Sequence, residues 1–348
     1  MQLSKDNGLY VGSFFMENNV TVIIPAYNAE KYIRKCIESV LVQKYKHFCI
    51  LVVNDGSIDN TENIVKDYIK EYSEIICLYT KPNGGLSNAR NYGIKRAKTK
   101  YVTFLDSDDY LDCNYLEILM NMAEKNNADM VCSGQYKITE DGQVLNKISY
   151  HPTNKKCLTR RLNISGKLYR LDYLNKWNIN FPEGKTYEDN SFNLQCMFLT
   201  DKCYFIDYEG YYQVVHEGSI TSKAIEADKL PLQEWSECIA KITNCTFQEI
   251  DKPLFEFTVL SFFTYFLFVR NRKREYLSNT IQKKDKNSIV HIASAFEDIV
   301  NYNFPNAVRN KYARLFKYKE LQLQQRLGVK VFALLCKTKL LKPVAYFL

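Results

Sequence analysis

Short apolar runs alternate with amphipathic stretches through the first part of the chain. Runs rich in branched side chains predict strands at residues 20–24, 49–53, 75–79, 101–105 and 130–133. Apolar residues recur at helical spacing between these runs, and they predict helices near residues 29–43, 60–72, 86–97 and 114–126. The runs are apolar throughout rather than alternating, which is typical of strands buried on both faces. The pattern therefore predicts an α/β fold with a mostly parallel sheet flanked by helices.

The pattern changes near residue 225, beyond which glycine becomes rare and helical periodicity dominates. We expect an extension over residues 1–15, an α/β domain over residues 16–225 and a mainly helical, basic region over residues 226–348. The sequence leaves open whether translation starts at Met1 or Met16. The apolar segment 254–269 is short for a membrane span. We interpret it as a buried core helix, with a membrane-embedded helix as the alternative.

Composition narrows the class of protein. Of 348 residues, 46% are hydrophobic and 25% are charged, which is typical of a globular chain. The 11 cysteines form no CxxC pair and the 4 histidines fit no zinc pattern. Unpaired cysteines and the lack of a recognisable secretion signal favour a cytoplasmic protein with reduced thiols.

The positive charge is concentrated near the end of the sequence. The formal net charge is +8, and residues 307–348 hold ten Lys or Arg residues against the single Glu320. A local basic block predicts an anionic partner, either a membrane surface or a nucleic acid. The segment 326–348 mixes these charges with large apolar residues. Peripheral membrane contact is therefore one interpretation, and a helical subdomain with a solvated basic face is the other.

Four polar clusters follow the predicted strands. They are PAYN (25–28), NDGSIDNT (54–61), KPNGG (81–85) and DSDD (106–109). Ligands of open α/β sheets bind beyond the carboxyl ends of the strands, so these clusters are expected to converge on one site.

The carboxylates of NDGSIDNT have two interpretations. Asp55, close to Ser57, is placed to accept hydrogen bonds from the imide of a base or from ribose hydroxyls. Asp59 precedes a predicted helix, so a helix cap is as good an interpretation as ligand contact.

The DSDD cluster places Asp106, Asp108 and Asp109 directly after an apolar run. An Asp-x-Asp pair can hold a divalent metal jointly with substrate phosphates, and Mg²⁺ and Mn²⁺ favour such oxygen ligands. The alternative is a charged turn that begins the next helix.

Taken together, these motifs resemble the family 2 inverting glycosyltransferases, which have the GT-A fold, of the bacterial surface-polysaccharide type. The resemblance rests on VTVIIPAYNAEKYI, VVNDGSIDNT, NGGLSNARNYG and FLDSDD in this order. It covers residues 18–135 closely and extends loosely to about 222. It implies a GT-A domain and a nucleotide-sugar donor, with UDP the usual nucleotide.

The resemblance also assigns roles to single residues. It implies that Pro25, Tyr27, Asn28 and Asp55 hold the base, with Ser57 beside them, and that Gly85, Ser87 and Arg90 line the nucleotide and sugar. The DxD residues become Asp106 and Asp108, with Asp108 the more direct ligand of Mg²⁺ or Mn²⁺. Asp109 is expected to approach the sugar or to help position the metal.

Further matches lie downstream, in GKLYRLDYL, FPEG, YEDNSF and YYQVVHEGSIT. The resemblance implies a general base from the ED pair, for which we choose Asp189, with Glu188 as the alternate. The plain alternative is a carboxylate pair that stabilises a helix N-terminus. His216 is a candidate for the metal site or the diphosphate. Lys167 and Arg170 are candidates to bind phosphates or acceptor.

We therefore predict a hexosyltransferase-type enzyme that moves a sugar from a UDP-sugar to a glycan or lipid-linked acceptor. The place after the first strand lacks the GxGxxG of dinucleotide-binding enzymes, and no GxxxxGK[ST] is present. The alternatives are a non-catalytic nucleotide-sugar-binding protein and a nucleic-acid-binding protein. We expect no nucleic acid, because RNA-stacking motifs are absent and the acidic cluster would repel phosphates. The expected location is cytoplasmic, with peripheral contact at the inner membrane. The sequence does not identify the sugar, the acceptor, the linkage or the oligomeric state.

Overall fold

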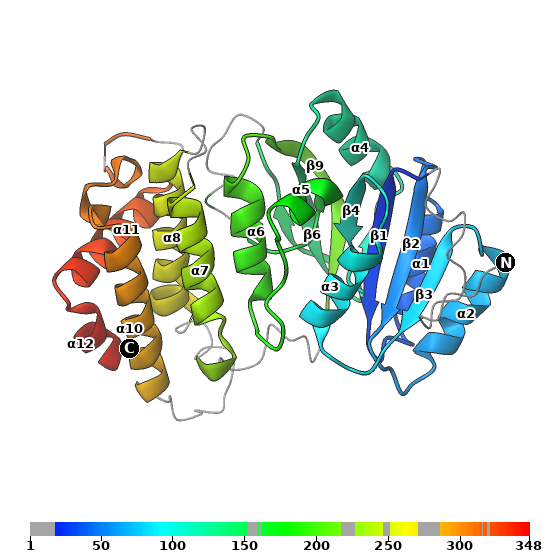
Figure 1. Ribbon diagram of the computed structural model, residues 1–348, viewed down its shortest axis with the longest axis horizontal. Coiled ribbons are helices and arrows are strands. Elements are labelled where there is room, and N and C mark those ends of the chain that lie inside the picture. The colour runs from blue at the N-terminus through cyan, green and yellow to red at the C-terminus, as the bar shows by residue number, and fades with distance from the viewer. Residues whose placement is uncertain are drawn as a thin grey trace. The chain divides into compact units, whose positions relative to one another are not determined.

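The structure is a computed structural model that describes residues 18–151, 159, 162–216, 227–245, 251–270, 286–314, 316–318 and 321–348. The predicted extension over residues 1–15 lies outside the described residues. The chain divides into two compact units. The first comprises Met1–Pro152 with Asn163–Lys223, and the second comprises Thr153–Leu162 with Ala224–Leu348. Figure 1 labels their elements along the chain.

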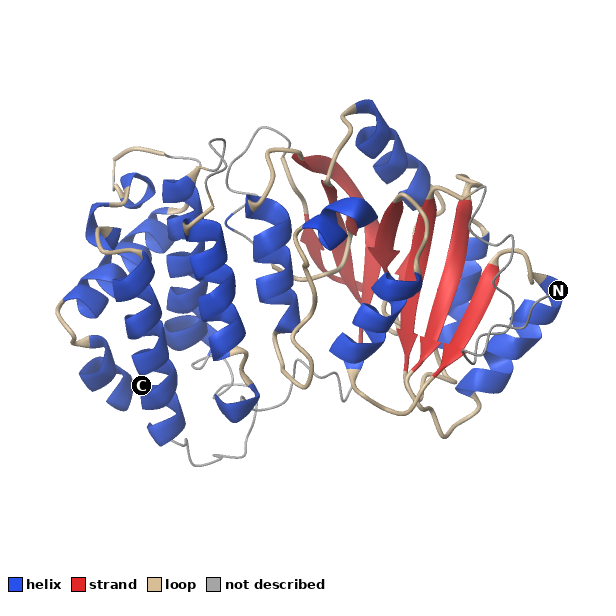
Figure 2. Ribbon diagram, in the orientation of Figure 1, coloured by secondary structure: helices blue, strands red, loops and turns tan. Residues whose placement is uncertain are grey.

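The strands of the first unit form one mixed sheet. Its order in the described residues is β3-β2-β1-β4-β8-β6-β9-β5, with β7 paired to β6. The strands are β1 (Val20–Ala26), β2 (Phe48–Asn54), β3 (Ile76–Thr80), β4 (Tyr101–Phe104), β5 (Tyr110–Leu111), β6 (Met130–Thr139), β7 (Val144–Ile148), β8 (Lys167–Arg170) and β9 (Cys203–Val215). Figure 2 shows the sheet in red with helices against it.

The predicted parallel arrangement holds in one half of the sheet. β1 pairs in parallel with both β2 and β4, and β2 pairs in parallel with β3. The other half is mixed, because β8 runs antiparallel to β4 and β6 while β9 runs parallel to β6. β5 and β7 add further antiparallel pairs. The α/β prediction is confirmed, and the antiparallel strands qualify the expectation of a mostly parallel sheet.

Helices cover both faces of the parallel half. The described helices of the first unit are α1 (Ile33–Leu41), α2 (Thr61–Glu71), α3 (Leu86–Arg96), α4 (Tyr115–Lys125), α5 (Leu171–Lys176) and α6 (Glu188–Phe198). α1, α2 and α4 pack against one face, where Ile24, Ile50 and Val52 are fully buried. α3 contributes Ala89 to a second cluster on the alternate side chains of β2 and β3. Strand residues therefore bury both faces, as the unbroken apolar runs predict.

A close approach fixes α3 against the central strand. A Cβ atom added to Gly93 would lie 2.5 Å from Cγ2 of Ile23, a contact that side chains do not tolerate. Glycine at this position lets the helix backbone approach β1. This packing matters for the site, because α3 carries Arg90.

The second unit is helical in its described residues. Its helices are α7 (Leu232–Thr243), α8 (Lys252–Tyr265), α10 (Lys286–Asn303), α11 (Leu323–Lys337) and α12 (Leu341–Tyr346), with short helical turns η3 (Ala227–Lys229), η4 (Phe266–Arg270), η5 (Ala307–Arg309) and η6 (Lys311–Ala313). Trp235 is fully buried against Phe262, Phe266 and Phe296, and Phe263 stacks on Phe296 at 3.8 Å. Aromatic contacts therefore form much of this core.

The apolar segment at 254–269 lies within α8 and η4. By length and composition, Lys252–Val269 is long and apolar enough to cross a membrane, with a mean hydropathy of 1.3, and 56% of it is buried inside the protein. Phe257, Val259 and Leu260 are fully buried, so the helix supplies core side chains to its own unit. This burial agrees with our interpretation of a core helix.

Candidate active site

The DSDD turn follows β4 and is tied down by β9. The carboxylate of Asp109 accepts hydrogen bonds from the Tyr211 hydroxyl at 2.7 Å and from the Val214 backbone N–H at 2.8 Å. Asp109 is 3% exposed, and burial together with the charge of Asp106 raises its pKa well above the usual range. Both oxygens thus hold β9, and the predicted approach of Asp109 to the sugar stays a prediction.

Asp108 faces a histidine at the end of β9. The Nε2 atom of His216 lies 2.7 Å from Oδ2 of Asp108, and the imidazole stacks on the Tyr32 ring with centroids 5.1 Å apart. Burial and the nearby charge of Asp106 raise the pKa of Asp108. The structure therefore brings together Asp108 and His216, which are 108 positions apart in the sequence.

Arg90 connects the DSDD turn to the ED pair. Its guanidinium donates to Asp106 at 2.7 Å and to Glu188 at 2.9 Å, and the side chain is only 2% exposed. Burial alone would lower the pKa of Arg90, but the charges of Asp106 and Glu188 raise it. The arginine stays charged and holds the two carboxylates near each other.

The ED pair begins α6. Tyr187 caps this helix with a left-handed backbone, φ 61°, and Glu188 and Asp189 occupy the first helical turn. Burial raises the pKa of Asp189 to about 7, and the charge of Glu188 adds to the rise. A carboxyl group with such a pKa suits a general base near neutral pH. The alternative of a helix-stabilising pair also fits this position, so the geometry allows both interpretations.

The NDGS segment follows β2 and meets the start of α3. Asp55 accepts hydrogen bonds from the backbone N–H groups of Gly84 at 2.9 Å and Gly85 at 2.7 Å, and it pairs with the Lys81 ammonium. Gly85 has φ +84°, and an added Cβ would meet nothing within 4 Å. Asp55 thus orders the loop at the N-terminus of α3.

The remaining residues of the predicted nucleotide site lie around this loop. Asn28 has a positive φ of 49°, and its backbone N–H donates to the Ser57 hydroxyl at 3.0 Å. Tyr27 is 51% exposed, whereas Ser87 is 4% exposed and Pro25 lies buried within β1. Asp59 accepts N–H bonds from Glu30 and Thr61, each at 3.0 Å. Asp59 therefore serves the start of α2, as the capping interpretation predicts.

Lys167 is placed differently from expectation. It is fully buried in β8, and its ammonium donates to the carbonyl of Ser165 at 3.2 Å and to the Asn163 side chain at 3.3 Å. Its charge also lowers the pKa of Asp189. Lys167 is thus near the ED pair but engaged by its own loop, and the prediction that it binds the nucleotide-sugar stays a prediction.

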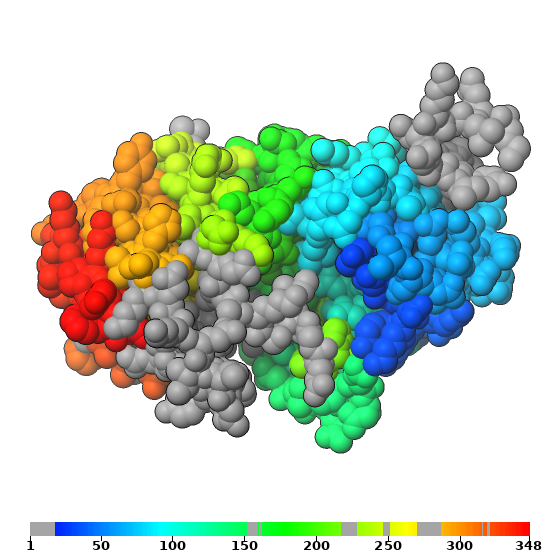
Figure 3. Space-filling model, turned by 90° about the horizontal axis from the view of Figure 1, so that it is seen from below, coloured from blue at the N-terminus to red at the C-terminus, as the bar shows by residue number. Residues whose placement is uncertain are grey.

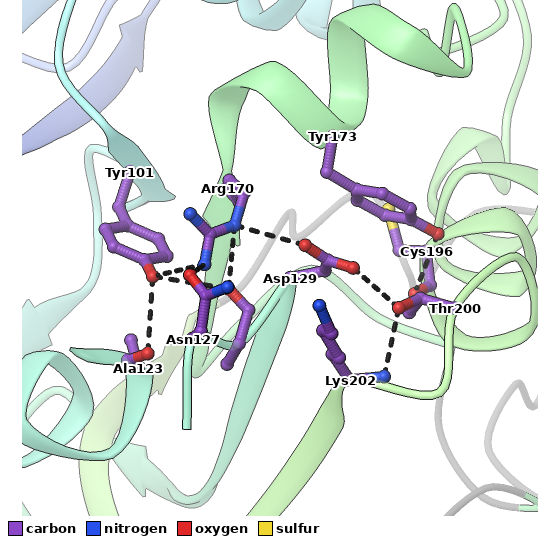
Figure 4. Close-up of polar contacts among 10 residues, drawn as sticks. Tyr101, Ala123, Asn127, Asp129, Arg170, Tyr173, Cys196, Thr200 and Lys202 are labelled. Carbon is purple, nitrogen blue, oxygen red and sulfur yellow. Dashed lines mark hydrogen bonds and ion pairs between the residues drawn. The ribbon is translucent and has the colours of Figure 1, made fainter. Parts of the chain in front are cut away.

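Arg170, a candidate to bind phosphates or acceptor, lies away from the DSDD turn. Arg170 pairs with Tyr101 at the first residue of β4, whereas the DSDD turn follows its last residue. Its guanidinium donates to Asn127 at 2.7 Å, to the Tyr101 hydroxyl at 3.0 Å and to Asp129 at 3.1 Å. Figure 4 shows this network, in which Asp129 also meets Thr200. Arg170 ties strands together at the edge away from the site.

Glu183 is a site-supporting residue that we did not predict. Its carboxylate accepts hydrogen bonds from Asn88 at 2.7 Å and Asn91 at 3.0 Å, which fastens the loop before α6 to α3. Asn91 also exchanges two hydrogen bonds with the backbone of Phe181. The FPEG segment could have drawn attention to Glu183. Its hydrogen-bond partners could not be predicted, because they lie about 90 positions earlier in the sequence.

The donor set fits a divalent metal that is shared with a ligand. Among the residues that the structure describes, no group of three or more His, Cys, Asp or Glu side chains could hold a metal by itself. Asp106 and Asp108 nevertheless lie close enough to raise the pKa of Asp108, which is 34% exposed in its side chain. A cation would relieve this repulsion, and Mg²⁺ typically binds through one or two carboxylates plus substrate phosphates.

The family model for Glycosyl transferase family 2 matches residues 21–192. This range holds Asp55, the DSDD turn, Arg90 and the ED pair. Residues 21–192 are therefore similar to a glycosyltransferase domain of family 2.

Glycosyltransferase GlyA from Streptococcus pneumoniae serotype 4 (strain ATCC BAA-334 / TIGR4) is 30% identical over 224 residues, which cover 59% of this chain and 32% of GlyA. The chain spans less than two thirds of the length of the first curated relatives that it matches.

Solved structures share the fold. S. aureus TarS 1-349, in complex with UDP-GlcNAc, has a TM-score of 0.66 at 20% identity, covering 92% of this chain and 91% of that chain. Mannosyltransferase PcManGT from Pyrobaculum calidifontis, in complex with GDP-Man and Mn²⁺, has a TM-score of 0.51 at 15% identity, covering 93% and 87%. These likenesses confirm the predicted GT-A fold with a helical C-terminal region.

Proposed function

We propose that this protein is an inverting glycosyltransferase that uses a UDP-sugar and a divalent metal. Its acceptor is a hydroxyl group of a glycan or a lipid-linked glycan, in the synthesis of a surface polysaccharide. The family 2 domain supports the reaction class. The TarS structure with UDP-GlcNAc supports a nucleotide-sugar donor, and the manganese in the PcManGT structure supports a metal.

The observation that carries this proposal is the double ion pair of Arg90. It joins Asp106 of the DxD segment to Glu188 of the ED pair. A donor-binding carboxylate and a candidate base are thus held in one place, although they come from different parts of the chain. The pKa of about 7 for Asp189 suits a general base and so supports catalysis over nucleotide-sugar binding alone.

The chemistry assigns one step to these residues. The acceptor oxygen forms a bond to the anomeric carbon while the bond to UDP breaks and UDP leaves with the electron pair. Asp189 takes the proton of the acceptor hydroxyl, help that is typically worth about 10²- to 10⁴-fold in rate. Mg²⁺ or Mn²⁺ bound at Asp108, with Asp106 and His216 beside it, would supply Lewis-acid stabilisation of the diphosphate charge. One displacement of this kind inverts the anomeric centre.

The decisive experiment measures UDP release from a panel of UDP-sugars, with and without Mn²⁺ or Mg²⁺. We expect one donor to be hydrolysed or transferred in a metal-dependent way, and Asp108→Ala to abolish this. Asp67→Ala, an exposed carboxylate on α2, is the matched control and should retain full activity. Binding of a UDP-sugar without any turnover would favour the non-catalytic alternative. Neither binding nor turnover would mean that the DSDD turn is structural only.

A further inference from the structure

An apolar stripe lies on the exposed side of α11. It consists of Leu323, Leu327, Val331 and Leu334, which are 57%, 50%, 46% and 50% exposed. At about 100° per residue, these four side chains span about 80° of the helix circumference. They form a continuous band rather than scattered single residues, and a band of this kind marks an interaction surface.

The opposite side of α11 already has its partners. Val329, Phe332, Ala333 and Cys336 are buried and belong to the core of the second unit. The helix therefore has two apolar sides, and the core explains only one of them. The exposed side of α2 offers a contrast, because its surface carries charges of both signs, including the pair Lys70–Asp67.

Positive charge accompanies the stripe without any negative charge. Lys330 and Lys337 are exposed, and at helical spacing they fall along one border of the stripe. Residues 321–348 contain five Lys or Arg residues and no Asp or Glu. Beyond α11, Leu340, Tyr346 and Phe347 are 50%, 52% and 84% exposed. The red C-terminal segment forms part of the surface in Figure 3.

We propose that the stripe on α11 docks onto an anionic lipid bilayer, with the leucines in the headgroup boundary and Lys330 and Lys337 against lipid phosphates. An apolar band bordered by lysines is the arrangement of interfacial helices. Long lysine side chains can lie along apolar surface while their ammonium groups reach the phosphates. A second copy of this chain would bring like charges together at the same face, which disfavours that occupant.

The test uses the full chain and vesicles of phosphatidylcholine alone or with about 30% phosphatidylglycerol. Cosedimentation should show binding to the anionic vesicles that weakens as salt is raised. The variant Lys330→Gln/Lys337→Gln should bind them about 30-fold more weakly, because each lysine near an anionic surface contributes about fivefold. The variant Leu327→Gln/Leu334→Gln should lose binding by about tenfold or more.

Matched controls separate the stripe from bulk charge and hydrophobicity. Lys70→Gln/Lys125→Gln removes the same charge from exposed positions of the first unit, and Val144→Gln/Leu145→Gln alters side chains that are 60% and 56% exposed on β7. Both controls should bind vesicles as the unaltered protein does. Circular dichroism checks that each variant is folded, which we expect because the buried side of α11 is unchanged.

Three results would overturn the proposal. They are failure of the unaltered protein to bind anionic vesicles, equal loss in the controls, or a dimer in sedimentation that Leu327→Gln/Leu334→Gln dissociates while vesicle binding persists. UDP release in lipid-free solution is measured in parallel. UDP release should be the same for all these variants. Failure of the membrane proposal can therefore be distinguished from failure of the proposed catalytic function.

Discussion

Arg90 and Glu188 form a partly buried ion pair across 98 positions of the sequence, with 2.9 Å between the guanidinium Nη1 and the carboxylate Oε1. The same guanidinium contacts Asp106. α3, the DSDD turn and the start of α6 therefore share one charged group, and a change at Arg90 reaches both carboxylates at once.

Replacing Arg90 should damage both stability and activity. Arg90→Ala leaves two carboxylates without their buried partner, and we expect the free energy of unfolding to fall by about 3–5 kcal/mol. Arg90→Lys should be better folded but still poorly active, because an ammonium group cannot reproduce the planar fork. Denaturant unfolding and UDP release measure the two effects, with exposed Lys98→Ala as the control. An Arg90→Ala protein as stable as the original would disprove the structural role.

Replacing Asp189 should affect turnover rather than donor binding. Asp189→Asn keeps the shape of the side chain and removes the base, so kcat should fall by about 10²- to 10⁴-fold while KM for the donor stays within about twofold. Glu188→Gln should instead lower stability, because it weakens the pair with Arg90. Steady-state kinetics of UDP release decide the assignment. A large rise in the donor KM of Asp189→Asn would move Asp189 from catalysis to binding.

The raised pKa of Asp189 predicts a pH dependence in two measurements. Log kcat/KM should rise with pH up to about 7 and then level off, because only the ionised carboxylate accepts a proton. The folded protein also keeps this proton between about pH 4 and 7, where the unfolded chain has lost it. The free energy of unfolding should therefore fall as the pH rises through that window, by at most about 1.4 kcal/mol per pH unit. Asp189→Asn should lose the rise in rate with pH and should show a weaker fall in stability, because the raised pKa values of Asp108 and Asp109 still contribute to that fall. A flat rate profile in the unaltered protein would contradict the assignment.

Asp55 should contribute to both the loop and the nucleotide. In Asp55→Asn, the amide NH₂ would face an N–H donor of Gly84 or Gly85, so at least one hydrogen bond is lost. We expect the free energy of unfolding to fall by about 1–3 kcal/mol. Calorimetric titration should show weaker binding of UDP. Unchanged UDP affinity in a destabilised variant would restrict Asp55 to holding the loop.

Arg170 should matter for folding but not for the reaction. Arg170→Ala removes the hydrogen bonds to Asn127, Tyr101 and Asp129, and the unfolding free energy should fall by about 1–3 kcal/mol. KM and kcat of the folded fraction should match those of the unaltered protein. A specific rise in KM would restore Arg170 as a ligand-binding residue.

The sequence predicted the parallel half of the sheet well, because β1 and β2 are buried on both faces and their runs are uniformly apolar. The antiparallel half gave no such signal. β8 is only four residues long and begins with the buried Lys167, and β9 mixes buried with exposed positions. Pairings of this kind depend on partners distant in the chain, which local periodicity does not reveal.

The candidate site shows the same division. Asp55, Asp106 and Asp108 could be predicted as site residues because each follows a strand, at the edge where ligands of such sheets bind. The hydrogen bond from Tyr211 to Asp109 could not be predicted from local sequence, because Tyr211 lies 102 positions later in the chain. Lys167 lies near the ED pair whereas Arg170 lies away from the DSDD turn. This difference depends on strand register, which pairs Arg170 with the first residue of β4.

The hydrogen bonds between Asp109 and β9 also have a consequence for the order in which the chain is synthesised. Tyr211 and Val214 emerge from the ribosome about one hundred residues after the DSDD turn that they fasten. A nascent chain that ends before β9 has the loops of the donor site but lacks the strand that fixes their carboxylates. The proposed donor site is thus completed late in synthesis, when most of the first unit has already been made.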